Sequence, residues 1–249
     1  MLLCAKTDFF SRDDVFKEQT EMTFGEKVLK FYRNLKLEDP LPAGVEVMNP
    51  YADPTCFEVC RKFYGEFYND NHKRFLILGI NPGRHGAGIT GIPFTDPIKL
   101  ETMFGIQNDL PKKPELSAEF IHPMIAAFGG YERFFSTFFI NSVSPLGFVQ
   151  GGKNLNYYDT PALKESLDPF IRKSISALLD LGIHREVVFC LGEGENFKFI
   201  RKLNAEEKWF AEIIPLAHPR FIMQYRRKFV SQYVEDYVKK LNSIPSNCQ

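Results

Sequence analysis

Residues 75–96 are FLILGINPGRHGAGITGIPFTD, an apolar run that ends in Asn-Pro-Gly and continues as a glycine-rich loop. A short apolar run, bounded by charge before it and by Gly and Pro after it, is typical of a strand buried on both faces of a parallel sheet. Asn81 precedes a proline, whose ring holds the preceding residue in an extended conformation. The sequence therefore predicts a strand end that points the Asn81 amide in a fixed direction.

The loop after this strand has the features of a ligand-binding segment. Gly83, Gly86, Gly88 and Gly91 allow backbone N–H groups to approach a ligand closely, and Phe94 follows as one large ring. Four glycines in nine residues exceed what a turn requires. The loop lacks both the GxGxxG dinucleotide pattern and the GxxxxGK[ST] phosphate loop. We expect it to surround a small planar ligand.

Composition limits the fold and the partners. The chain has 249 residues, of which 44% are hydrophobic, so it can bury a full core. We predict one domain over residues 1–249, with 1–70 as a helical N-terminal segment packed on it. Lys plus Arg and Asp plus Glu balance at 31 each, so any nucleic acid must be held by a local basic patch.

The cysteines indicate a reducing compartment and no metal centre. An odd count of five without a CxxC pair argues against a disulfide framework. Cys56 and Cys60 are one helical turn apart, but no second pair completes a four-ligand site, so we predict no metal and no cofactor. The opening residues have neither a basic n-region nor a long apolar stretch, which predicts no signal peptide and no membrane span. We expect a bacterial-type cytosolic or nucleoid location.

Hydrophobic spacing predicts alternating strands and helices. The predicted strands are 75–80, 137–143, 187–191 and 212–217. The predicted helices are 24–37, 54–68, 97–104, 118–128, 160–181, a segment after 192–194, and 225–241. Strands that alternate with helices form a parallel sheet covered on both faces. We therefore predict an α/β fold, with three α/β/α layers around a central four-stranded parallel sheet.

Three predicted strands end alike, with a polar residue and then a proline. The polar residues are Asn81, the segment Asn141–Ser144, and His218. In open α/β sheets, ligands bind beyond the carboxyl ends of the strands, so these groups are expected at one rim. Two amides, an imidazole and the Phe94 ring suit a nucleobase edge. Phosphoryl transfer instead requires a Lys or Arg cradle and metal-binding carboxylates.

These residues resemble the uracil-DNA glycosylase superfamily, especially its single-strand-selective monofunctional (SMUG) type. The loop is similar to the NPG…G…TGxPF pattern of that type, through Asn81-Pro82-Gly83, Gly86, Thr90-Gly91 and Pro93-Phe94. Asn141 followed by Ser144-Pro145-Leu146 is similar to the family's central strand, and His218-Pro219 stands where its second motif begins.

The resemblance implies a uracil-DNA glycosylase-like fold and a monofunctional base-excision repair enzyme. Such an enzyme hydrolyses the N-glycosidic bond of uracil or modified uracil after flipping the base out of DNA. In this interpretation Asn81 orients the attacking water and Phe94 stacks on the base. Asn141 pairs with N3–H and O4 of uracil, and His218 donates to O2 and stabilises the departing anion. The resemblance implies no cofactor.

The chain departs from the family pattern at two places. Ala87 stands where relatives often carry methionine, so the room around the base 5-position differs and the choice between uracil and 5-hydroxymethyluracil stays open. With Gly83, Ala87 is assigned to the substrate pocket. After His218, Arg220-Phe221 replaces the usual Ser-Pro. We predict DNA contacts here from apolar wedge residues and from cations that pair with phosphates: Arg220, Phe221, Ile222, Arg226, Arg227 and Lys228.

Two alternatives stay open. The mismatch-specific uracil/thymine branch shares the GINPG opening, but it usually has Asn where this chain has His218. A non-catalytic module for damaged DNA or a nucleotide needs the pocket but has no use for the pair of Asn81 and His218. We expect a monomer that acts on DNA, with no membrane partner and with single- or double-strand preference undecided.

Overall fold

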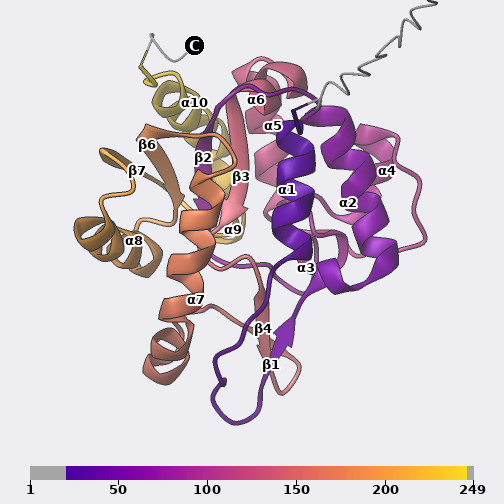
Figure 1. The fold of residues 1–249 in the computed structure, drawn as a ribbon. Helices are drawn as coiled ribbons and strands as arrows, with labels where there is room; N and C mark the ends of the chain where they lie inside the picture. Colours follow the sequence, from indigo (N-terminus) through magenta and orange to yellow (C-terminus); the bar gives the residue numbers. More distant parts are fainter. Residues whose placement is uncertain (1–20, 246–249) are drawn as a thin grey trace, which may run out of the picture.

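The computed structural model describes residues 21–245, and the predictions for the outermost residues lie outside this range. Its main sheet has four parallel strands in the order β3-β2-β6-β7. The strands are β2 (Arg74–Gly79), β3 (Phe138–Ser142), β6 (Ile183–Leu191) and β7 (Glu212–Leu216). All four predicted strands and the predicted fold class are therefore confirmed (Figure 1).

Helices flank this sheet on both sides. Figure 1 shows α1 and α2 beyond the β3 edge and α8 next to β7. The helices and 3₁₀ turns are α1 (Phe24–Arg33), η1 (Pro50–Ala52), α2 (Pro54–Phe67), α3 (Ala87–Thr90), α4 (Pro97–Phe104), α5 (Ala118–Phe128), α6 (Tyr131–Thr137), α7 (Pro161–Leu179), α8 (Glu195–Glu207), α9 (Pro219–Tyr225), η2 (Arg227–Phe229) and α10 (Val230–Leu241). Within residues 21–245, no helix is both long and apolar enough to cross a membrane.

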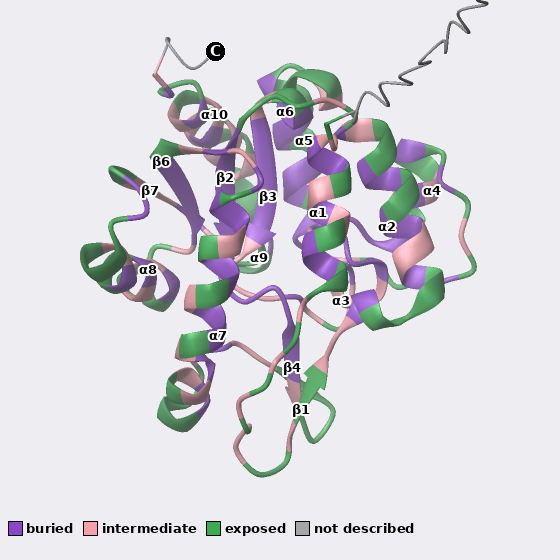
Figure 2. Ribbon diagram, viewed as in Figure 1, coloured by how far each residue is buried: buried purple, intermediate pink, exposed green. Residues whose placement is uncertain are grey.

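The central strand is the most deeply buried element. All six residues of β2 are buried, which explains its continuous apolar sequence (Figure 2). The strand carries the glycine-rich loop directly from its carboxyl end. The core therefore fixes the start of this loop at one rim of the sheet.

A second, smaller sheet was not predicted. It contains β1 (Val45–Met48), β4 (Gly147–Gln150) and β5 (Lys153–Leu155), paired antiparallel in the order β1-β4-β5. These strands are short and partly exposed, so they lack the apolar run on which the sequence prediction relied. Because β4 starts just after β3 ends, this sheet lies at the same rim as the glycine-rich loop.

The prediction of one closing helix over 225–241 was partly wrong. The chain instead forms α9, the 3₁₀ turn η2 and then α10. Pro219 starts α9 in the first helical turn, where its missing N–H costs nothing, and His218 caps it. The second motif therefore opens its own short helix at the sheet rim.

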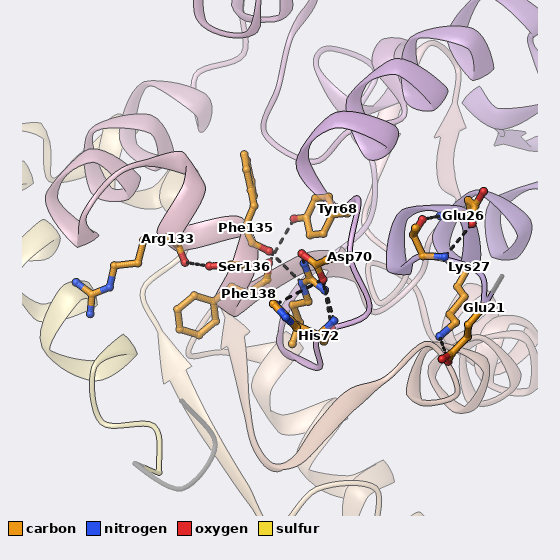
Figure 3. Close-up of polar contacts among 12 residues, drawn as sticks. Glu21, Glu26, Lys27, Tyr68, Asp70, His72, Arg133, Phe135, Ser136 and Phe138 are labelled. Atoms are coloured by element: carbon orange, nitrogen blue, oxygen red, sulfur yellow. Dashed lines mark hydrogen bonds and ion pairs between the residues drawn. The ribbon is translucent and has the colours of Figure 1, made fainter.

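The N-terminal helices are fixed to the edge of the main sheet. The Tyr68 hydroxyl donates to the Phe138 carbonyl of β3 at 3.3 Å. The fully buried Arg74 guanidinium pairs with Asp70 at 2.5 Å and donates to the Phe135 carbonyl at 3.1 Å. Figure 3 shows Tyr68, Asp70, Phe135 and Phe138 gathered at this junction. These bonds hold the C-terminal end of α2 against the edge of the main sheet.

Candidate active site

A cleft of about 390 Å³ lies at the carboxyl ends of the main strands. Five of the predicted catalytic and base-contacting residues line it: Asn81, Gly83, Ala87, Phe94 and His218. Two other clefts, of about 420 and 560 Å³, lie between α1 and α7 and near the amino end of β2, and neither contains these residues. The rim cleft is therefore the candidate active site.

Asn81 is held by backbone groups at the end of β5 and just after it. Its Nδ2 donates to the Leu155 carbonyl at 3.1 Å, and its Oδ1 accepts from the Tyr157 N–H at 3.0 Å. An amide oxygen has two lone pairs, so Oδ1 retains one for a further donor. The small sheet thus fixes the amide and leaves an acceptor site beside the cleft.

The glycine-rich loop folds tightly at its centre. The Gly88 N–H donates to the Gly83 carbonyl at 2.8 Å, and a β-carbon at Gly88 would lie 2.3 Å from that oxygen. Only glycine permits this approach. On the outer side, the Cys60 thiol donates to the Thr90 carbonyl at 3.2 Å and the Tyr51 hydroxyl to the Gly91 carbonyl at 3.1 Å. The N-terminal segment therefore supports the loop from behind.

Phe94 has a left-handed backbone, with φ of 53°, which is uncommon for a large residue. Its carbonyl accepts from the His122 Nε2 at 3.1 Å, and the His122 Nδ1 therefore accepts from the Tyr131 hydroxyl at 2.8 Å. Burial lowers the pKa of His122 to about 4, so this imidazole is neutral at physiological pH. A chain of two hydrogen bonds, from Tyr131 through His122 to the Phe94 carbonyl, thus holds the Phe94 backbone at the cleft.

His218 is a neutral donor that faces the same ring. Its Nδ1 accepts from the Arg220 N–H at 3.1 Å, so the proton of the neutral imidazole lies on Nε2. Burial, helped by the Arg220 charge, lowers the pKa of His218 to about 4. Its ring centroid lies 6.5 Å from that of Phe94, at an angle of 67°. The cap of α9 therefore fixes both the tautomer and the position of one N–H donor.

Asn141 does not line the cleft, contrary to the sequence prediction. Its side chain is 2% exposed, and its Nδ2 donates to the Tyr32 hydroxyl of α1 at 3.1 Å. Successive side chains on a strand point to opposite faces, and Ser142 is the residue of β3 that lines the cleft. The sequence prediction therefore identified the strand end that reaches the cleft, but the side chain that lines the cleft is that of the neighbouring Ser142.

The predicted DNA-contacting segment needs a similar correction. Ile222 is fully buried and belongs to the core, where α9 packs against α5, so it cannot act as a wedge. Phe221 and Tyr225 are 40% and 62% exposed, and both line the cleft with Arg220. The side chains of Arg226, Arg227 and Lys228 are exposed, and their predicted contacts with DNA phosphates stay a prediction.

The matching family model covers residues 66–242 and is described as the uracil DNA glycosylase superfamily. The chain belongs to this superfamily. A single-strand selective monofunctional uracil-DNA glycosylase of Rattus norvegicus is 30% identical over 172 residues, and that of Mus musculus is 29% identical. These matches cover 61% of this chain and 57% of the relatives, so the chain spans just over half of their length.

A solved glycosylase structure extends the likeness to nearly the whole fold. The crystal structure of wild-type Pedobacter heparinus SMUG2 is 43% identical in sequence, with a TM-score of 0.87. The match covers 90% of this chain and 99% of that one. The superfamily, the SMUG-type likeness and the fold predicted from the motifs are confirmed.

Several residues that line this cleft were missed by the sequence analysis. They are polar or aromatic groups from four separate segments: Glu115, Ser117, Ser142, Asn154, Asn156, Tyr158, Gln224 and Tyr225. Ser142 is the neighbour of a predicted residue, and Gln224 and Tyr225 follow the second motif. Asn154 lies in β5. The others lie in connections whose sequence has no recognisable pattern.

Glu115 is the most unusual of these residues. Its Oε2 and the His85 Nδ1 are the two buried side-chain polar atoms without a hydrogen-bond partner among residues 21–245. A β-carbon at Gly86 would lie 2.1 Å from this Oε2, so the carboxyl group lies directly against the loop. Burial, followed by the charge of Asp96, raises the pKa of Glu115 to about 8. The carboxyl group is therefore protonated at neutral pH.

Replacing Glu115 by Gln is expected to stabilise the protein at alkaline pH. The folded protein retains the Glu115 proton up to about pH 8, whereas the unfolded chain loses it near the usual value of 4.5. The wild-type free energy of unfolding therefore falls as the pH rises through this window. At pH 8 the variant is expected to exceed the wild type by about 1–3 kcal/mol, and below pH 4 the difference vanishes.

Chemical denaturation at a series of pH values measures this effect. Glu132→Gln, at an exposed site on α6, is the matched control and leaves the pH profile unchanged. Parallel profiles for wild type and Glu115→Gln would contradict the assignment.

Proposed function

We propose that this chain is a monofunctional uracil-DNA glycosylase that hydrolyses the N-glycosidic bond of uracil-type bases in DNA. The observation that carries the proposal is the placement of the Asn81 acceptor, the Phe94 ring and the neutral His218 donor around one cleft. The family match and the SMUG-type relatives support it. No part of the cleft resembles a phosphoryl-transfer site.

His218 provides the main electrostatic contribution. As the bond between C1′ and N1 breaks, negative charge accumulates on the base and the sugar becomes oxocarbenium-like. The Nε2–H of His218 donates to O2 of the departing base. A preorganised donor of this kind contributes about 3–4 kcal/mol to the stability of a transition state. The neutral imidazole keeps its proton and requires no proton transfer for this task.

Asn81 positions the water molecule that acts as the nucleophile. The free lone pair of its Oδ1 accepts a hydrogen bond from a water molecule, whose oxygen attacks C1′. The water supplies a hydroxyl group to the sugar, the base leaves with the bonding electron pair, and a proton is released. The products are an abasic site and a free base, with no covalent enzyme intermediate.

The remaining contacts position the flipped base. Phe94 stacks on the base face, which adds an attraction of about 1–3 kcal/mol. Gly83 presents bare backbone, and Ala87 forms a wall together with Glu115. A protonated carboxyl group next to Ala87 can donate a hydrogen bond, so this wall accepts a polar 5-substituent as well as plain uracil.

α9 and the residues after it form the proposed DNA surface. Phe221 and Tyr225 are exposed aromatic rings 5.8 Å apart, and they replace Ile222 as the residues that fill the gap in the stack. The Arg226 guanidinium lies over the Phe221 ring at 5.4 Å. With Arg220, Arg227 and Lys228 it supplies the local cations that the neutral total charge requires.

The experiment uses single- and double-stranded oligonucleotides that carry one uracil. Alkali cleaves the strand wherever the base has been removed, so strand breakage measures the reaction. We expect breakage at uracil and none in the matched cytosine strand. No breakage at uracil, 5-hydroxymethyluracil or hypoxanthine would overturn the enzyme proposal and leave a binding module. The single domain, the monomeric state and the cytosolic location stay predictions.

A further inference from the structure

The groove of about 420 Å³ between α1 and α7 lies apart from the active-site cleft and shares no lining residue with it. Figure 1 shows the two helices side by side. Residues three, four or seven positions apart lie on one face of a helix, and one such face of each helix lines the groove. These residues are Lys27, Lys30 and Phe31 of α1 and Phe170, Lys173 and Ala177 of α7. We call this feature the α1/α7 groove.

The floor of the α1/α7 groove is apolar. It includes Phe31 and Leu35 on one side and Phe170 and Ala177 on the other. Leu35 and Ala177 are half-buried, so part of this apolar surface is open to solvent. Within residues 21–245, no helix besides α1 and α7 lines the groove. Two helix faces beside an apolar floor can accept the apolar stripe of a further helix, which is a recurring mode of peptide recognition.

The rim of the groove carries cations without partners. Lys30, Lys36 and Lys173 line the groove and are exposed, and within residues 21–245 none of them forms an ion pair. Arg172, the neighbour of Lys173 on α7, instead pairs with three carboxylates. The charges of the helix surface outside the groove are thus matched within the chain, whereas those at the rim are left for a partner.

The net charge of the groove is positive, although the whole chain is neutral. Lys27 is its fourth lysine and pairs with the exposed Glu21 at 3.3 Å, a contact of little energy that a partner carboxylate can replace. Asp180 is the one acidic residue in the lining, among residues 21–245. Four lysines and one aspartate give the lining a charge of +3. The groove therefore complements an acidic partner.

The apolar floor favours a peptide over a nucleic acid. Single-stranded bases stack on exposed aromatic rings, but Phe31 and Phe170 are only 9% and 4% exposed and offer no such platform. Asp180 would also repel a phosphate. An amphipathic helix matches both parts of the groove, because its apolar stripe covers the floor while carboxylates beside the stripe meet the lysines.

We propose that the α1/α7 groove binds an acidic amphipathic helix of another protein, with the apolar stripe of that helix on the floor and its carboxylates against Lys30, Lys36 and Lys173. This interaction is separate from the proposed function, because the groove and the active-site cleft share no residue. A partner held in this way leaves the cleft open to substrate.

The test uses a fluorescently labelled synthetic peptide of about 18 residues, long enough to form a helix. It carries Leu at positions i, i+3, i+4 and i+7 and Glu on both sides of this stripe. Fluorescence anisotropy measures its binding to the full-length chain. The double variant Lys30→Glu with Lys173→Glu is expected to weaken binding about tenfold, since attraction becomes repulsion at two rim positions. Both lysines are exposed, so the variant keeps the fold.

The matched control is Lys62→Glu with Lys239→Glu, which changes the total charge equally at two exposed positions outside the groove. This control is expected to keep the wild-type affinity, and a peptide with Ser in place of Leu is expected not to bind. Uracil release should be the same in both double variants and the wild type, so failure of this proposal leaves the proposed function intact.

Four results would overturn the proposal. The first is no saturable binding of the Leu peptide, and the second is equal weakening in the two double variants. The third is weaker binding of an undamaged oligonucleotide in the groove variant alone, which would assign the groove to nucleic acid. The fourth is a wild-type dimer that the groove variant dissociates, which would assign the groove to a second copy of this chain.

Discussion

Replacing His218 by Ala is expected to lower kcat for uracil release by about 10²–10³-fold, because it removes a preorganised donor that acts in the transition state. KM is expected to change little, since the neutral base accepts only a weak bond before its charge develops. His218→Gln retains an N–H group at the end of the side chain and should lose less. Single-turnover rates on a uracil-containing oligonucleotide measure the effect.

The pH profile checks the protonation state of His218. Because its pKa is lowered to about 4, His218 stays neutral from pH 6 to 9 and adds no inflection to kcat in that range. His72→Ala is the control, since the His72 side chain is 75% exposed and lies at the opposite end of β2. A His218→Ala variant with wild-type kcat would show that the donor lies elsewhere in the cleft.

Replacing Asn81 by Ala is expected to lower kcat by about 10²–10³-fold, because the attacking water loses its hydrogen-bond acceptor. The same change removes the bonds to Leu155 and Tyr157, so the free energy of unfolding should fall by about 1–2 kcal/mol. Kinetics and chemical denaturation on the same samples separate the two effects.

Asn204 provides the matched control for this structural loss. Its side chain also bridges backbone groups, with 2.8 Å bonds to both the N–H and the carbonyl of Phe210, and it lies outside the cleft. Asn204→Ala is expected to lose comparable stability and to retain kcat. If Asn204→Ala lost activity as Asn81→Ala does, general loosening of the fold would explain both, and Asn81 would have no special role in catalysis.

The strands and the rim were predictable because their signals are local. β2 is an uninterrupted apolar run, and a polar residue before proline ends it whatever the rest of the chain does. His218 follows from the same pattern at β7. The parallel order of the strands then places both groups at one edge, as the structure confirms.

Which side chain points into the cleft and which into the core was not predictable from such local signals. Asn141 and Ser142 are both polar and adjacent, and the choice between them depends on Tyr32, which lies 109 positions away in the chain. Ile222 and Phe221 are likewise both apolar, and only packing against α5 shows which of them is buried. No sequence motif marks Glu115, because its raised pKa arises from burial in the tertiary structure and from the nearby Asp96.

The sequence by itself determined the sheet, the loop and the positions of Asn81, Phe94 and His218, since each depends on chemistry within a few residues of the chain. Only the tertiary structure decided which of two neighbours on β3 lines the cleft, which residues of α9 are exposed beside it, and where the uncharged carboxyl group of Glu115 is held. Those outcomes depend on contacts between segments far apart in the chain, and a side chain turns toward whichever partner buries or bonds it best.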